Sequence, residues 1–198
     1  MNKLKRNLSS WSRWLHLYLS MVSFLILLFF AVTGITLNHT EWFSNMQHTI
    51  TIKGKLDANW VAGNDSNGVK KLEIVEFLRN TSKISGAVNE FTIDEYQCTI
   101  SFNGPGYTAD VFVNREDGSY EIAETKTGIW GVLNDLHKGR DTGKAWAWVI
   151  DISAALMVIV SLTGLMMLFF LKKKRVAGIL LVLAGGLLSY LLYALFVP

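Results

Sequence analysis

The sequence predicts an α-helical membrane protein with three transmembrane helices and a small α+β domain outside the membrane. Three apolar stretches without Lys, Arg, Asp or Glu predict the helices; they cover residues 14–40, 152–171 and 176–198. A helix needs about 20 apolar residues to cross a bilayer, so each stretch is long enough and a soluble protein is excluded. The polar segment between the first two stretches combines alternating apolar residues with turn signals, which predicts the domain.

Basic residues flank the apolar stretches and predict the orientation of the chain. The basic residues before the first stretch are Lys3, Lys5, Arg6 and Arg13, and four more fill the gap at 172–175. Because Lys and Arg flanks are retained in the cytoplasm, the N-terminus and this gap are expected there, and the polar segment and C-terminus outside. The expected organisation is a cytoplasmic tail over 1–13, transmembrane helices over 14–38, 145–171 and 176–197, a cytoplasmic turn over 172–175, an outer domain over 39–127 and an interfacial segment over 128–144.

The outer segment has the pattern of a helix followed by hairpins. Apolar residues at near-helical spacing predict a helix over 69–79. Alternating runs predict strands, which lie at 49–53, 87–93, 97–102, 107–113 and 119–123. Breaks that contain glycine, at 104–106 and 116–118, fit hairpin turns between these strands.

A further helix is expected shortly before the second apolar stretch. Apolar residues recur at helical spacing over 128–137 and form a stripe of Ile129, Val132, Leu133 and Leu136. An amphipathic helix of this kind lies on a membrane surface. We therefore expect it at the outer face, near the point where the first transmembrane helix emerges.

Several functional classes are excluded by composition and motifs. Cys98 is the only cysteine, so the chain is not a disulfide scaffold. The outer segment carries more acidic than basic residues, which argues against a nucleic-acid partner. Dinucleotide-binding, P-loop, HExxH, CxxC and GxSxG motifs are missing, and the cytoplasmic parts are too short for an NADH or flavin domain. Any electron donor would therefore be a quinol, a reduced partner protein or a small molecule.

The four histidines are the candidate metal-ligating residues. His16 lies at the cytoplasmic end of the first transmembrane helix and His39 at its outer end, about 34 Å apart at 1.5 Å per residue, so they cannot bind one ligand together. His137 ends the amphipathic helix at the expected level of His39, and His48 lies further outside. Imidazole binds haem iron, zinc, copper or nickel, so His39 and His137 are a candidate axial pair. Interfacial polar roles remain the alternative, because two histidines lack the spacing of a structural metal site.

Charged neighbours of His137 support a cofactor site. Lys138, Arg140 and Lys144 could pair with haem propionates, or else form a solvated loop or contact lipid headgroups. Asp135 could accept a hydrogen bond from His137 and thereby set its tautomer, as carboxylates behind metal ligands do. Helix capping or surface exposure is the other interpretation of Asp135.

Two glycines lie within the transmembrane helices, and His16 has no obvious partner. Gly34 and Gly164 each follow a threonine and allow close helix approach, for helix packing or for the clearance of a flat macrocycle. Met166 and Met167 are other ligand candidates at the level of His16. A His–Met pair, a His16 pair across a homodimer and a structural histidine are all open.

Five motifs together resemble the PepSY-associated transmembrane helix family. They are RWLH at 13–16, TGITLNH at 33–39, LNDLHKGR at 133–140, Ile-Asp at 150–151 and TGL at 163–165. The similarity covers nearly the whole chain, and the segment from about 60 to 125 resembles a PepSY domain. The fold class that follows is an α-helical membrane protein with three transmembrane helices plus a small periplasmic α+β PepSY-like domain.

The resemblance implies a function and a location. Larger members include ferric-siderophore reductases, and short three-span members resemble a ferric reductase that assists ferrous iron uptake. It implies a bacterial inner-membrane protein with haem b and makes His16, His39 and His137 the candidate haem ligands. With His39 and His137 as the axial pair, one outer haem would leave about 20–25 Å of membrane to cross, so a second haem near His16 in a homodimer is a further hypothesis. Electrons would pass from an inner donor to ferric iron or a ferric chelate outside, and ferrous iron to a separate transporter.

Two other functions remain open at this stage. PepSY domains resemble regulatory modules in some contexts, so the chain could be a non-catalytic membrane module that holds a partner protein. Alternatively, the histidines could bind iron or a siderophore directly in an accessory protein. The first predicts no cofactor, and the second predicts iron retention without a haem spectrum.

Overall fold

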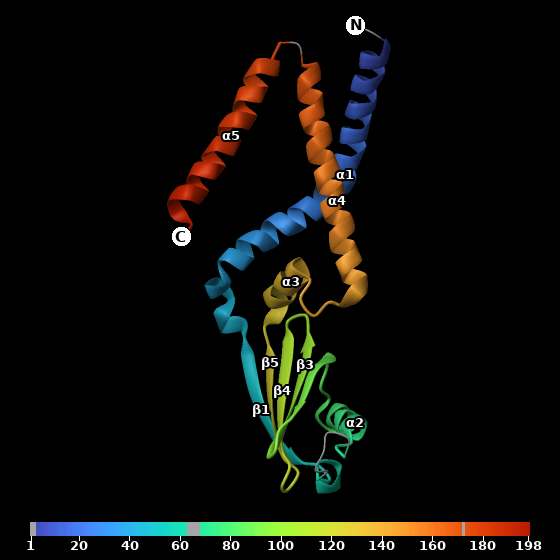
Figure 1. The fold of residues 1–198 in the computed structure, drawn as a ribbon, viewed down its shortest axis with the longest axis vertical. Helices are drawn as coiled ribbons and strands as arrows, with labels where there is room; N and C mark the ends of the chain where they lie inside the picture. The colour runs from blue at the N-terminus through green and yellow to red at the C-terminus, as the bar shows by residue number, and fades with distance from the viewer. Residues whose placement is uncertain (1–2, 63–67, 172) are drawn as a thin grey trace. The chain divides into compact units, whose positions relative to one another are not determined.

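The computed structural model describes residues 3–62, 68–171 and 173–198, so residue 172 of the expected basic turn lies outside the described residues. The chain divides into two compact units, Met1–Leu28 with Asp151–Pro198 and Phe29–Ile150. Its long helices are α1 (Lys3–Asn38), α4 (Gly143–Phe170) and α5 (Arg175–Phe196) (Figure 1). The helix α1 contributes to both units, and α4 also begins in the second unit and continues in the first.

Among the described residues, three helices are long and apolar enough to cross a membrane, which confirms the predicted transmembrane part of the fold class. They cover Asn7–Asn38, Gly143–Phe170 and Arg175–Phe196. At 1.5 Å per residue even the shortest, with 22 residues, spans the roughly 30 Å of a hydrocarbon core. Apolar side chains cover their outer surfaces, as expected where lipid rather than protein surrounds a helix. The chain is a membrane protein.

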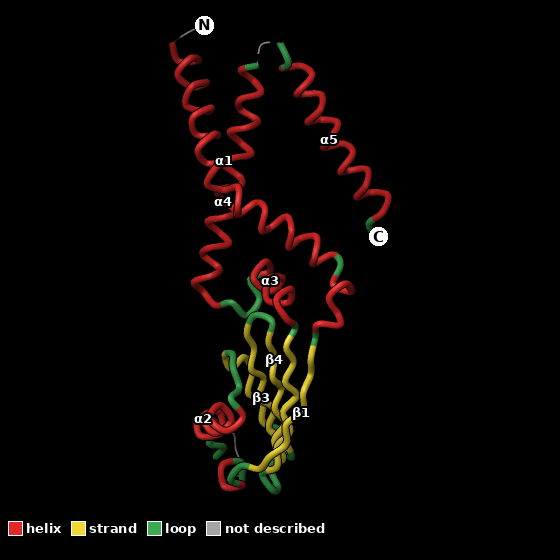
Figure 2. Tube along the Cα trace, turned by 180° about the vertical axis from the view of Figure 1, so that it is seen from behind, coloured by secondary structure: helices red, strands yellow, loops and turns green. Residues whose placement is uncertain are grey.

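The second unit contains one antiparallel sheet, in the order β1-β5-β4-β3-β2 (Figure 2). The strands are β1 (His48–Lys55), β2 (Ala87–Ile93), β3 (Gln97–Gly104), β4 (Tyr107–Asn114) and β5 (Ser119–Lys126). The alternating runs therefore predicted every strand. Four of the strands extend by one to three residues past the run that predicted them, because ladder pairing continues up to turn residues such as Gly104, opposite Tyr107.

One face of this sheet carries the hydrophobic core. The helix α2 (Lys71–Ser82) packs on that face through Ile74 and Leu78, both fully buried. Alternate side chains of the central strands meet it, and the fully buried ones are Cys98, Ile100, Phe102, Ala109, Val111, Val113 and Ile122. Burial of these apolar side chains, about 1.5–3 kcal/mol for each large one, holds helix and sheet together.

Two short helices lie at the end of the sheet where β1 begins and β5 ends. They are the 3₁₀ helix η1 (Thr40–Met46) and α3 (Gly128–Lys138) (Figure 1). The buried residues of α3 are polar, Asn134 and Asp135, whereas Ile129 on the predicted apolar stripe is 63% exposed. The helix thus turns Asn134 and Asp135 to the protein, and its apolar stripe is half-buried except at the exposed Ile129, which suits the predicted membrane surface.

Candidate functional site

His137 lies in the second unit against the end of α1. Its Nδ1 is 2.6 Å from the hydroxyl oxygen of Thr33. That hydroxyl also donates to the carbonyl of Phe29, 2.6 Å away. A hydroxyl has one proton, so Thr33 accepts the hydrogen bond and Nδ1 of His137 carries the hydrogen. Nε2 of His137 is then left with a lone pair, and no hydrogen bond from the described residues occupies it.

The surroundings of His137 keep its ring neutral. Burial lowers the pKa of His137 below its ordinary value, and the charge of Lys138 lowers it further. Phe30 packs edge-on against the ring, with 5.0 Å between ring centres. A neutral imidazole is the form that binds a metal, so His137 is in its ligand form at neutral pH.

His16 lies in the first unit, on α1, and its ring contacts α4. Its Nδ1 is 3.1 Å from the carbonyl oxygen of Val160 and 3.0 Å from the hydroxyl oxygen of Thr163. A carbonyl oxygen only accepts, so Nδ1 of His16 carries the hydrogen and Nε2 the lone pair. The hydroxyl of Thr163 itself donates to Val160, at 2.9 Å. An open apolar hollow of about 520 Å³ lies beside the ring and is lined by His16, Leu17, Ser20, Met21 and Phe24.

The two glycines predicted to permit close approach both lie beside a histidine ring. A Cβ added at Gly164 would lie 3.2 Å from Cε1 of His16, and one added at Gly34 would lie 3.8 Å from Cε1 of His137. The space they leave is therefore filled by imidazole. Each Thr-Gly pair provides one hydroxyl for Nδ1 and one gap for the ring.

His39 has a different environment from His137. Its ring stacks on Trp42, with 4.2 Å between ring centres and 5° between planes, and its Nδ1 is 3.1 Å from a carboxylate oxygen of Glu41. The side chain is 38% exposed. Among the described residues, no hydrogen bond or ring contact joins His39 to His137, and His48 is exposed at the start of β1.

Asp135 does not set the tautomer of His137, so that prediction is wrong. Its carboxylate accepts a hydrogen bond from the backbone N–H of Gly106, at 2.9 Å, and pairs with Nε of Arg140, at 3.3 Å. The Asp135 side chain points toward Gly106, between β3 and β4. Thr33 of α1, instead of Asp135, accepts the hydrogen bond from Nδ1 of His137. The sequence alone did not show that Thr33 is the acceptor for His137, because the tertiary fold brings these two residues together.

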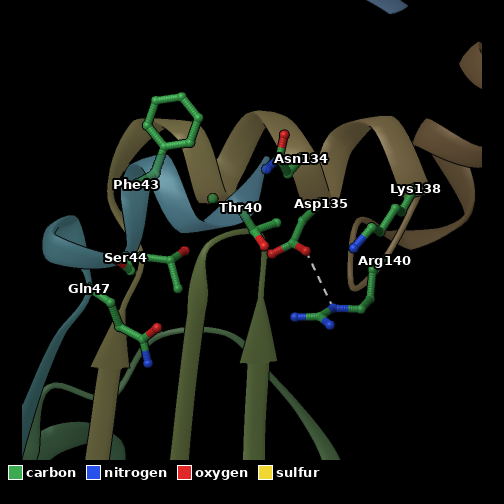
Figure 3. Close-up of a pocket in the computed structure, with 10 residues that line it drawn as sticks. Thr40, Phe43, Ser44, Gln47, Asn134, Asp135, Lys138 and Arg140 are labelled. Atoms are coloured by element: carbon green, nitrogen blue, oxygen red, sulfur yellow. Dashed lines mark ion pairs between the residues drawn. The ribbon is translucent and has the colours of Figure 1, made fainter. Parts of the chain in front are cut away.

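The three candidate cations near His137 have separate positions. Lys138 and Arg140 line a pocket of about 180 Å³ between η1 and α3 (Figure 3). Arg140 pairs with Asp135 and, at 3.7 Å, with Asp141. Lys144 is exposed in the first turn of α4 and does not line this pocket.

The fold and these sites define a membrane protein with three spanning helices, an α+β domain and histidines held at helix contacts. The model of the PepSY_TM-like family matches residues 10–198, nearly the whole chain. The chain therefore belongs to the PepSY_TM-like family, which confirms the resemblance noted in its motifs. Searches of curated proteins and of solved structures gave no match.

Proposed function

We propose that this chain is a bacterial inner-membrane b-type haem reductase that passes electrons to ferric iron or a ferric chelate outside. The observation that carries the proposal is the matched state of His16 and His137. At both, Nδ1 donates to a protein oxygen and Nε2 keeps an unused lone pair. This arrangement, in which a second group orients the ring, is typical of histidines that bind a metal.

The residues present fit a b-type haem. When bound, haem supplies a one-electron couple. His137 and His39 would hold the iron of an outer haem, since Nδ1 of each is already engaged and Nε2 is left. His16 would hold a second haem together with a ligand from a second copy of the chain. The propionates would meet cations, for which Lys138, Arg140 and Lys144 are the candidates.

The proposed reaction needs an electron source and an electron sink. A quinol releases two electrons and two protons and becomes a quinone, and the two electrons reduce two ferric ions to ferrous ions; a reduced partner protein could supply the electrons instead. The basic flanks support a donor side in the cytoplasm. The ferrous product would pass to a separate transporter. A non-catalytic partner-binding module and a direct iron-binding accessory are the competing functions.

Visible spectra of the detergent-purified protein, air-oxidised and then reduced with dithionite, test the proposal. A sharpened Soret band with a reduced α band is expected. His137→Ala should remove the outer haem, His39→Ala should change its spectrum to that of a high-spin form, and His16→Ala should remove the second haem. The matched control is His48→Ala, which should leave the spectrum unchanged. Colourless protein made with ample haem would overturn the proposal and favour the partner-binding module.

A further inference from the structure

A polar groove runs along α3. One wall is η1 with the residue that follows it, and the other is a single face of α3 (Figure 3). The lining residues are Thr40, Phe43, Ser44, Gln47, Thr127, Gly131, Asn134, Asp135, Lys138 and Arg140. Its volume of about 180 Å³ is below the usual 300–1,000 Å³ of drug-sized sites, so it suits a small molecule.

The charge of the groove is positive at one end. The carboxylate of Asp135 is already paired with Arg140 and with the N–H of Gly106. Lys138 makes no ion pair with the described residues, and it lines the groove together with Arg140 (Figure 3). Asp135 and Asp141 already balance the charge of Arg140, which leaves the charge of Lys138 for an anionic ligand. The groove therefore favours an anionic ligand at this end.

Two further polar groups line the groove. The hydroxyl oxygen of Thr127 is buried and has no hydrogen-bond partner among the described residues. A Cβ at Gly131 would lie 1.8 Å from that oxygen, so only glycine there leaves room for the hydroxyl. Asn134 is 9% exposed, and its amide oxygen lies 2.7 Å from the hydroxyl of Thr36. A buried polar group without a partner calls for one, and a ligand oxygen in the groove would provide it.

We propose that this groove binds a small polycarboxylate, with Lys138 and Arg140 on its carboxylates and Thr127 on a further oxygen. Such acids also chelate ferric iron, so, if the proposed reductase function holds, the groove binds the organic part of the substrate. Phosphate shares this oxoanion chemistry, either free or as the headgroup of an anionic lipid. The size of the groove and the several separate polar groups favour a molecule with more than one carboxylate.

Titration calorimetry with citrate, on the full chain in nanodiscs of phosphatidylcholine, tests this binding without iron or electron transfer. Saturable heat is expected. Lys138→Gln and Arg140→Gln should each weaken binding by about tenfold or more, and Thr127→Val by a smaller factor. The matched control is Lys55→Gln, since Lys55 ends β1 and does not line the groove. Melting curves of the variants establish that the domain still folds.

Three outcomes would overturn the proposal: no heat with the wild-type chain, equal binding by the Lys138 variant, or inorganic phosphate that binds as tightly as citrate. Loss of citrate binding in nanodiscs with phosphatidylglycerol would also overturn it and assign the groove to lipid headgroups. Citrate binding by a colourless protein would support the groove and refute the reductase. A haem spectrum without citrate binding would support the reductase and refute the proposal for the groove.

Discussion

The two histidine sites use the same parts in opposite arrangements. At one, α1 supplies the histidine, His16, and α4 supplies Thr163 and Gly164. At the other, α1 supplies Thr33 and Gly34, and α3 supplies His137. The difference lies in the number of acceptors: Nδ1 of His16 has a carbonyl and a hydroxyl, whereas Nδ1 of His137 has a hydroxyl alone. The form of the ring with its hydrogen on Nδ1 is therefore stabilised by two acceptors at His16 and by one acceptor at His137.

Removing the threonine hydroxyls should give the largest difference between the sites. Thr33→Val leaves the buried Nδ1–H of His137 without an acceptor, at a cost of about 1–3 kcal/mol. We expect a fall of about 10- to 100-fold in haem affinity, typical of losing a group that orients a ligand. Thr163→Val leaves the carbonyl of Val160 and should weaken binding by about threefold or less. Haem titration of the two apo-proteins measures both effects, and equal losses would contradict the comparison.

Filling the glycine gaps should give an intermediate difference. At Gly164 a methyl group would lie 3.2 Å from the His16 ring, so Gly164→Ala should displace the ring and cost about 1–3 kcal/mol. At Gly34 the methyl group would be in ordinary contact, 3.8 Å away, and Gly34→Ala should be neutral or stabilising by about 1 kcal/mol through its helix propensity. Thermal unfolding in detergent compares the variants. A stable Gly164→Ala protein with an unchanged spectrum would refute the tight fit.

Acidification should have the smallest effect of these three changes. The effect is a loss of stability that arises at the His137 site. The folded-state pKa of His137 is lowered by burial and then by Lys138, so below about pH 6.5 the unfolded chain binds more protons than the folded one. Stability from this group is therefore full above that pH and falls as the pH drops toward the folded pKa. From pH 7 to 5 we expect the melting temperature of the wild type to fall further than that of His137→Gln. Parallel pH dependence of the two proteins would contradict this.

The sequence predicted most of the fold because its signals are local. Charge-free stretches mark the spanning helices, and period-two alternation marks every strand. The sequence did not predict which side of α3 faces the protein. Ile129 and Leu136 indicate an apolar stripe, but they do not show that Asn134 is turned toward the protein.

The histidine sites were predicted only in part. Position along the chain identified His16 and His137 as candidates. The partners of their Nδ1 atoms come from helices 104 or more residues away, and only the tertiary packing selects them. The same limit explains why Asp135 was assigned to His137 instead of to Gly106 and Arg140.

Cys98 has a consequence for how the chain can be studied. The thiol is fully buried in the core, and burial raises its pKa, so it is a poor nucleophile. Any cysteine placed on the surface then becomes the one reactive thiol among the described residues, without removal of the native one. In intact cells a membrane-impermeant maleimide should label Lys55→Cys and spare Lys174→Cys, which makes the orientation of the chain readable directly.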